Sequence, residues 1–227
     1  MPAAEKRKLE QEQMKINRIN HIIECAFGLF AENGFETITM NQIASESEIG
    51  VASLYRYFST KEDLAIEAAI YSWKLEESLF TKVFGTSEYE ALNGYKQMEA
   101  LLEVFEEALV SQGAFFRFVY YFDSFIKKEK VSPDRLSRYE DVISGSKNIV
   151  ISALEKGIKD GSITFSNGQN QSLAKATLSE LYFSITHSLF SLAQKLSLSG
   201  EMLNMDKQVH SEKQMQLLIQ MMLSSLR

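Results

Sequence analysis

The sequence contains few of the residues that interrupt helices or cross-link chains. Among its 227 residues there are two prolines, Pro2 and Pro133, and one cysteine, Cys25. A single cysteine excludes an internal disulfide. Cys25 lies among apolar residues at helical spacing, where a core position is a simpler interpretation than a reactive thiol. The scarcity of proline, combined with apolar residues that recur every three or four positions, predicts an all-α chain.

Long apolar runs and catalytic motifs are also missing. The sequence has no run of about eighteen apolar residues, so we expect no membrane-spanning helix. Its first residues lack an apolar signal core, so we expect a cytoplasmic protein. Its three histidines, His21, His187 and His210, are scattered rather than set at metal-ligand spacing. A glycine-rich phosphate loop, a nucleophile elbow and a Cys-x-x-Cys pair are absent. We therefore expect no enzyme activity, no catalytic residues, no metal and no cofactor.

A surplus of positive charge is missing as well. The formal net charge is −6, residues 1–61 hold 7 basic and 8 acidic residues, and residues 62–227 hold 17 and 22. Nucleic-acid binders are usually more basic, so a DNA-binding surface on this chain must be a local cluster of positive charge. We expect its affinity for DNA to fall as the salt concentration rises. Seven basic residues of the first part can line one side: Lys6, Arg7, Lys8, Lys15, Arg18, Arg56 and Lys61. The polar start, to about Gln13, is predicted to be a frayed or flexible arm, with a minor-groove contact of Lys6-Arg7-Lys8 as the alternative.

The most informative pattern lies in residues 39–63, which predict two short helices joined by a tight turn. Thr39 is a good N-cap, and Gln42 follows at the spacing of a capping box. A polar stretch then ends the first helix, and Gly50 can cap the second. Leu54 and Phe58 are four residues apart, so they share a face that points inward. A second helix held in this way can enter the major groove of DNA.

The remaining side chains of the second helix are candidates for DNA contacts. The small tip residues Val51 and Ala52 can touch a thymine methyl group, and Ser53 can bond to several bases. Tyrosine hydroxyls and lysine can bind phosphates, which position a protein without reading sequence. Tyr55 and Tyr57 have packing as their alternative role, and Arg56 is either a solvated or phosphate-facing charge or a guanine contact. The candidate DNA-binding residues are Thr39, Gln42, Gly50, Val51, Ala52, Ser53, Tyr55, Arg56, Tyr57 and Lys61.

These motifs resemble the signature of the tetracycline-repressor (TetR) family. The resemblance rests on residues 50–58, on the following Lys61-Glu62-Asp63-Leu64, and on residues 22–34, which are similar to that family's first helix and its glycine stop. It covers about residues 16–68. The sequence departs from the family pattern at Glu48, where a turn glycine is usual, at Gly50, where Ser or Thr is common, and at Ala52. Because of these departures, the DNA bases that the family recognises cannot be assigned to this protein.

The rest of the chain predicts a helical body. The apolar periodicity indicates helices over residues 64–84, 89–111, 114–130, 134–160, 171–197 and 207–226, with Ser166-Asn167-Gly168 in a loop. Ser132 and Pro133 suit the cap and first position of the fourth of these. We thus expect an all-α chain of about nine helices. A three-helix DNA-binding domain with its N-terminal arm occupies residues 1–63. A larger helical domain for effector binding and dimerisation occupies residues 64–227.

Residues 115–125 contain seven aromatic side chains. Rings on every face of a helix indicate surroundings made of protein, and ordinary core is the first interpretation. The alternative is a ring-lined pocket for a small hydrophobic or aromatic molecule, and the resemblance implies an effector pocket in this body. The candidate lining residues are Phe105, Tyr121, Phe122, Phe125, Tyr139, Tyr182, Phe183 and His187.

The last two long helices, near residues 171–197 and 207–226, carry apolar stripes that fit either an intramolecular core or self-association. The resemblance implies a homodimer held by these helices. A DNA-binding domain with one short recognition helix also needs two copies to gain affinity. The two-fold symmetry of such a dimer predicts a roughly palindromic operator in double-stranded DNA.

The resemblance implies a one-component transcriptional regulator, more specifically a repressor that a small-molecule effector releases from its operator. The acidic balance and the departures at Glu48 and Gly50 favour one alternative. In it, the chain is a helical ligand carrier or protein-interaction module that no longer reads DNA.

Overall fold

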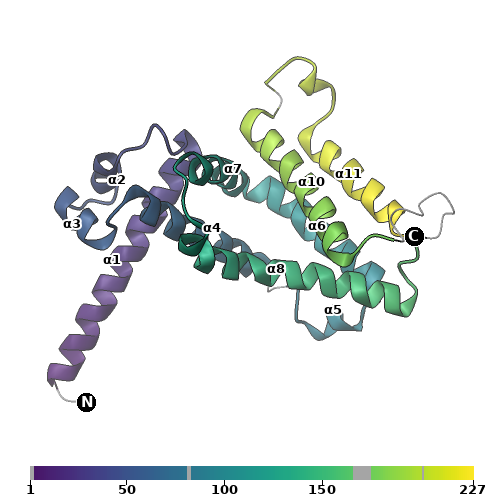
Figure 1. Ribbon diagram of the computed structural model, residues 1–227, viewed down its shortest axis with the longest axis horizontal. Coiled ribbons are helices and arrows are strands. Elements are labelled where there is room, and N and C mark those ends of the chain that lie inside the picture. The colour runs from purple at the N-terminus through teal and green to yellow at the C-terminus, as the bar shows by residue number, and fades with distance from the viewer. Residues whose placement is uncertain (1–2, 81–82, 166–174, 201) are drawn as a thin grey trace. The chain divides into compact units, whose positions relative to one another are not determined.

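The computed structural model describes residues 3–80, 83–165, 175–200 and 202–227, and within these ranges every regular element is helical (Figure 1). Ten α-helices and one 3₁₀ turn, η1 (Asp206–Gln208), are present in this described part of the chain. The α-helices are α1 (Ala3–Asn33), α2 (Met40–Glu46), α3 (Val51–Tyr57), α4 (Lys61–Phe80), α5 (Ser87–Ala91), α6 (Gly94–Ser111), α7 (Gly113–Lys128), α8 (Pro133–Asp160), α10 (Leu178–Ser199) and α11 (Ser211–Ser225). The predicted all-α fold is confirmed. None of the described helices combines the length and apolarity that crossing a membrane requires.

The chain forms two compact units. The first contains residues 1–72 and 118–139, and the second contains residues 73–117 and 140–227. Helices α4, α7 and α8 each begin in one unit and end in the other. The predicted boundary at residue 63, between a DNA-binding domain and an effector-binding domain, is defined by function and stays a prediction.

The start of the chain is helical, so the predicted flexible arm is wrong. Helix α1 begins at Ala3, and its described side chains as far as Arg18 are exposed. Residues 3–18 consist almost entirely of strong helix formers, such as alanine, lysine, glutamate and glutamine. Polarity suggested an arm, but helix propensity and continuity with the packed part of α1 favour a helix.

Some predicted boundaries also change. The segment 89–111 is two helices rather than one, because the Asn93 side chain accepts a hydrogen bond from Lys96 N and caps a new helix. Helix α10 begins at Leu178 behind a capping box of Thr177 and Glu180. The predicted loop at residues 166–168, the predicted helix start at Gln171 and residues 81–82 of the first predicted body helix lie outside the described residues.

The two short helices α2 and α3 form as predicted. Thr39 caps α2, its backbone N–H donates to Gln42 Oε1 over 2.8 Å, and its side chain accepts from Gln42 N over 3.3 Å. Gly50 is the N-cap of α3. Both ends of the predicted capping box are therefore present.

The turn after α2 places Glu48 in the left-handed region. The N–H of Ile49 donates to Ala44 O over 2.9 Å, and the N–H of Glu48 donates to Ser45 O over 3.2 Å. This hydrogen-bond pattern is a Schellman motif, whose left-handed position usually carries glycine. Here that position is Glu48, with φ of 53°. The departure from the family pattern at Glu48 is therefore accommodated by a strained backbone rather than by a different turn.

The core of the first unit is a stack of phenylalanine rings. Phe35 lies in the loop after α1, with its ring centroid 4.1 Å from that of Phe30 and 4.7 Å from that of Phe125, in stacked arrangements. Phe118 and Phe122 of α7 approach the same ring at 5.4 Å and 6.0 Å. Aromatic pairs in such geometries add to the free energy of burial. They join α7 to α1 and to the loop between α1 and α2.

The second unit depends on one close helix crossing. A Cβ atom on Gly94 would lie 1.9 Å from Gly157 N, so the backbones of α6 and α8 touch where both residues are glycine. The N–H of Gly94 donates to Asp160 Oδ2 over 2.9 Å, and the N–H of Tyr95 donates to Ser162 Oγ over 3.0 Å. The end of α8 thus caps the start of α6 and satisfies its orphan donors.

Glu76 of α4 is a charged residue in the interior of the second unit. Its exposed fraction is 2%, and burial raises its pKa from the ordinary value of 4.5 to about 7. A carboxyl that is easier to ionise in the unfolded chain makes the folded state less stable as the pH rises.

We expect Glu48→Gly to stabilise the first unit. The substitution removes a left-handed backbone cost of about 1–2 kcal/mol but gives the unfolded chain about 0.4–1 kcal/mol of extra entropy. The free energy of unfolding, measured by urea denaturation, should rise by about 0.5–1 kcal/mol. Glu48→Ala is the control, because it removes the carboxylate and keeps the strained backbone. An equal gain in both variants would assign the cost to charge and contradict the backbone explanation.

We expect Glu76→Gln to stabilise the protein only above acid pH. Below the unfolded pKa of 4.5 both side chains are neutral, and the variants should be equally stable. Above the folded pKa of about 7, the wild type should be less stable by up to about 3 kcal/mol, the free-energy equivalent of the pKa difference. Thermal or urea unfolding across this pH range measures the difference. The exposed neighbour Glu77, changed to Gln, should show no such pH dependence. A constant difference at every pH would refute the explanation by ionisation.

Candidate nucleic-acid interface and ligand cavity

Helix α3 is held by two buried side chains and displays the others. Leu54 and Phe58 are 0% and 6% exposed, which confirms the predicted inward face. Val51 at the tip is 37% exposed and Tyr55 is 49% exposed. Both side chains are therefore accessible to another molecule at the surface of the first unit.

The other predicted DNA-binding residues surround this tip. Thr39, Gln42, Gly50, Ala52 and Arg56 are exposed, and Ser53 and Tyr57 are half-buried. The guanidinium of Arg56 lies over the Tyr57 ring, 5.7 Å from its centroid. The pair therefore brings a fixed positive charge and a phenol together at the end of α3.

Lys61, another predicted phosphate contact, is half-buried against the phenylalanine stack. Its ammonium donates a hydrogen bond to the Phe35 carbonyl and lies 5.9 Å and 5.7 Å from the ring centroids of Phe30 and Phe125. Burial lowers the pKa of this ammonium. In this structure Lys61 stabilises the phenylalanine stack, a role that sequence spacing did not indicate.

Further positive charge lies on α1. Lys8, Lys15 and Arg18 are exposed and share one helical face by their spacing, and Lys6 forms an exposed ion pair with Glu10 at 3.9 Å. The first unit thus has basic groups on α1 and α3 despite its nearly balanced charge.

A surface cleft of the first unit adjoins the end of α3. Tyr57 and Phe58 line it, and its volume is about 370 Å³. Two arginines at the start of α8 bind the start of α4 there. Arg135 donates to Asp63 Oδ1 over 2.9 Å and to Thr60 Oγ1 over 3.3 Å, and Arg138 pairs with Glu67. The Arg135 hydrogen bond contributes to lowering the pKa of Asp63 in spite of its partial burial.

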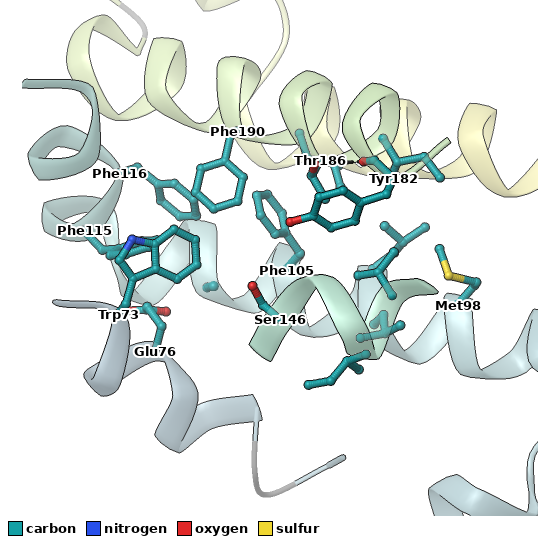
Figure 2. A pocket seen from close by; sticks show the side chains of 17 residues that line it. Trp73, Glu76, Met98, Phe105, Phe115, Phe116, Ser146, Tyr182, Thr186 and Phe190 are labelled. Carbon is teal, nitrogen blue, oxygen red and sulfur yellow. Dashed lines mark hydrogen bonds between the residues drawn. The ribbon is translucent and has the colours of Figure 1, made fainter. Parts of the chain in front are cut away.

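The second unit contains a ring-lined cavity of about 90 Å³ (Figure 2). Its walls come from helices α4, α6, α7, α8 and α10. Figure 2 labels ten of the lining residues, namely Trp73, Glu76, Met98, Phe105, Phe115, Phe116, Ser146, Tyr182, Thr186 and Phe190. The rings make close contacts: Trp73 and Phe115 are 5.1 Å apart, and Phe105 and Phe190 are 5.3 Å apart. A cavity of this size holds a small organic group, and a larger ligand requires its walls to move.

The structure brings two of the eight predicted pocket residues to this cavity. Phe105 and Tyr182 line it. Phe183 and His187 are exposed on α10, with ring centroids 5.2 Å apart. Tyr121, Phe122, Phe125 and Tyr139 belong to the first unit, where Phe122, Phe125 and Tyr139 are buried. These six residues are not among those that line the cavity.

The sequence interpretation missed Trp73 and Glu76. Both are on α4, three residues apart, so they share a helix face. The signal for Glu76 in the sequence is a carboxyl at a position that the helical period assigns to the apolar face of α4.

In the described part of the chain, no group of three or more His, Cys, Asp and Glu side chains could hold a metal ion. Cys25 is half-buried, its sulfur is 3.7 Å from His21 Nε2, and burial raises its pKa. A thiol with a raised pKa remains protonated and is a poor nucleophile.

Residues 22–68 match the family model described as "Bacterial regulatory proteins, tetR family". An HTH-type transcriptional regulator of Staphylococcus aureus (strain USA300) is 48% identical over 54 residues, which cover 24% of this chain and 29% of that protein. The chain therefore matches less than a third of the length of this curated relative. The residues matched by the family model include α2 and α3.

Two solved structures share the fold over nearly the whole chain. FadR from Bacillus subtilis, in complex with stearoyl-CoA, superposes with a TM-score of 0.64 at 14% identity and covers 91% of this chain and 98% of its own. The ketosteroid transcriptional regulator KstR2 of Mycobacterium tuberculosis gives a TM-score of 0.62 at 17% identity, over 92% and 94%. At this identity the likeness shows the fold alone. The match to the tetR family of bacterial regulatory proteins therefore extends over residues 22–68.

Proposed function

We propose that this protein is a DNA-binding one-component transcriptional regulator, and more specifically a repressor that a small molecule releases from its operator. The observation that carries the proposal is the display of the α3 tip. Val51, Tyr55 and Arg56 face solvent while Leu54 and Phe58 hold the helix in place. Such a helix can enter the major groove with its N-terminal residues near base edges. The protein would act in the cytoplasm, where the DNA is.

The proposed contacts follow from exposure. Val51, Ala52 and Ser53 would meet base edges, with Thr39, Gln42 and Gly50 beside them, and Tyr55, Arg56 and Tyr57 would meet phosphates or bases. We remove Lys61 from the proposed phosphate contacts because its ammonium is bound to the Phe35 carbonyl. The basic face of α1 adds charge that is independent of sequence.

The cavity of the second unit supports the effector part of the proposal. The FadR structure was solved with stearoyl-CoA, and this chain has a ring-lined cavity within a similar fold. Helix α4 contributes Trp73 and Glu76 to its walls, and helix α8 contributes Ser146 and Ile149.

The same two helices carry the contacts between Arg135 and Asp63 and between Arg138 and Glu67 in the first unit. A ligand that displaces the cavity walls would displace these helices, and DNA binding would weaken if the released state binds that ligand better.

A homodimer is part of the proposal. The predicted stripes of α10 and α11 are largely intramolecular core, since Leu189 and Met215 are 2% and 0% exposed. Two members of the predicted α11 stripe, Leu217 and Met221, face outward at 44% and 63% exposed, and so does Phe183 of α10 at 45%. Two copies joined through this surface would present two α3 helices to a roughly palindromic operator.

The alternative function, a ligand carrier that does not read DNA, is favoured by the net charge of −6. One measurement distinguishes the two functions: whether the protein binds the DNA upstream of its own gene in a salt-dependent manner.

We expect the wild type to bind that DNA and to bind more weakly as salt rises. Tyr57→Phe removes one hydroxyl and should weaken binding about threefold to tenfold, the equivalent of one hydrogen bond. Arg56→Gln should reduce the slope of log Kd against log salt by about one. Fluorescence anisotropy at several salt concentrations measures both effects.

Tyr120→Phe is the matched control for these variants, because Tyr120 is a 46% exposed tyrosine of the same unit on α7. It should leave DNA binding unchanged. Absence of salt-dependent binding by the wild type would overturn the regulator proposal and favour the carrier.

We expect Met221→Arg to shift the protein from dimer to monomer, because a charge on a 63% exposed apolar position opposes burial between copies. Analytical ultracentrifugation over a range of concentrations measures the change. Ile158→Arg places the same charge on a 48% exposed apolar position of α8 and should leave the dimer intact. A monomeric wild type, or equal dissociation in both variants, would contradict the proposed interface.

A further inference from the structure

The walls of the cavity in the second unit contain a single charged side chain, Glu76, among the residues that the structure describes there. It is 2% exposed, and Figure 2 shows it beside Trp73 at one end of the cavity. Most of the other walls are aromatic rings and aliphatic groups. Three lining residues carry hydroxyls: Ser146, Tyr182 and Thr186.

Two of these hydroxyls already have acceptors. Ser146 Oγ donates to Ile143 O over 2.7 Å, and Thr186 Oγ1 donates to Tyr182 O over 2.8 Å. Within the described part of the chain, no residue forms a hydrogen bond or ion pair with the Glu76 carboxyl. A buried carboxyl in these surroundings lacks the partner that normally compensates for its desolvation.

Aromatic rings gather at the end of the cavity where Glu76 lies. The face of an aromatic ring carries negative charge density, which attracts cations. Trp73, Phe115 and Phe190 are mutually in contact at this end of the cavity. A positive group placed among them would be attracted by the rings and by the carboxylate together. An anionic group would be repelled by both.

We propose that the cavity binds a ligand with a positively charged amino group, which Glu76 holds between the aromatic walls. The proposal deepens the function proposed above and rests on it for its regulatory meaning, because the bound amine would be the effector. A neutral apolar ligand of the same shape would leave Glu76 without a partner, and a carboxylate ligand would be excluded. The small volume, about 90 Å³, suits a compact amine or the head of a longer molecule.

The test uses three probes with the same ring and different charge, namely benzylamine, benzyl alcohol and benzoate. The chain has one tryptophan, Trp73, and it lines the cavity next to Glu76. Its fluorescence therefore reports binding at this site. The titrations are done on the full chain without DNA, at a pH of about 8, where Glu76 is largely ionised because its pKa is about 7.

We expect the wild type to bind benzylamine about tenfold to a hundredfold more tightly than benzyl alcohol, the preference that one charge-assisted hydrogen bond provides. Benzoate should bind more weakly than either. In Glu76→Gln, which keeps the shape of the side chain, the preference for the amine should fall to about twofold or less. Glu77→Gln removes an exposed carboxylate from the next position and should keep the wild-type preference.

Four results would overturn the proposal: equal binding of amine and alcohol by the wild type, tighter binding of benzoate, an amine preference that survives in Glu76→Gln, or no response of Trp73 to any probe. Circular dichroism checks that each variant is folded. Operator binding is measured separately. If the amine preference depends on Glu76 while benzylamine leaves DNA affinity unchanged, the ligand class stands and the proposed regulatory role fails.

Discussion

The stack of Phe30, Phe35 and Phe125 is the contact on which the first unit of this protein depends. Helix α3 has seven residues, and a helix of that length has no stability of its own in water. Its position is therefore set by tertiary packing. Leu54 and Phe58 are buried in the core of the first unit and hold the helix there. The stack fixes α1, the loop at Phe35 and α7 together, and Lys61 ties the start of α4 to this loop through the Phe35 carbonyl. Because Lys61 follows the last residue of α3 by four positions, α3 is joined by a short connection to this packed aromatic core.

The features of the reading helices that could be predicted are those that depend on local chemistry. The capping box of Thr39 and Gln42, the cap at Gly50 and the inward pair of Leu54 and Phe58 need only residues a few positions apart, and all are present. Lys61 could not be interpreted in this way. Its partner carbonyl is 26 residues away in the chain, and a lysine near a recognition helix looks equally suited to a phosphate until the fold is known. The helical start of α1 is a different case, since propensity at residues 3–18 predicts it and polarity was given too much weight.

The aromatic segment 115–125 shows why a pocket is harder to predict than a core. Core and pocket were offered as alternatives, and the segment supplies both. Phe118, Phe122 and Phe125 pack in the first unit, whereas Phe115 and Phe116 line the cavity of the second. Consecutive turns of one helix thus have different surroundings, and composition alone cannot assign them. The remaining walls come from α4, α6, α8 and α10, so the cavity exists only when five helices are placed together.

Glu76 connects stability with the proposed function. A buried carboxyl whose pKa is raised to about 7 lowers the stability of the folded protein at neutral pH, and an apolar side chain at this position would be a simple way to remove that cost. Residues that weaken a fold without any compensating contact are characteristic of sites that bind something. A ligand that neutralises Glu76 would recover this free energy only in the state that binds it, which is the differential affinity that a population shift requires. The carboxyl would thus serve as the source of the coupling as well as the point of recognition, because the free energy released on pairing it is available to move α4, the helix whose first turn follows α3.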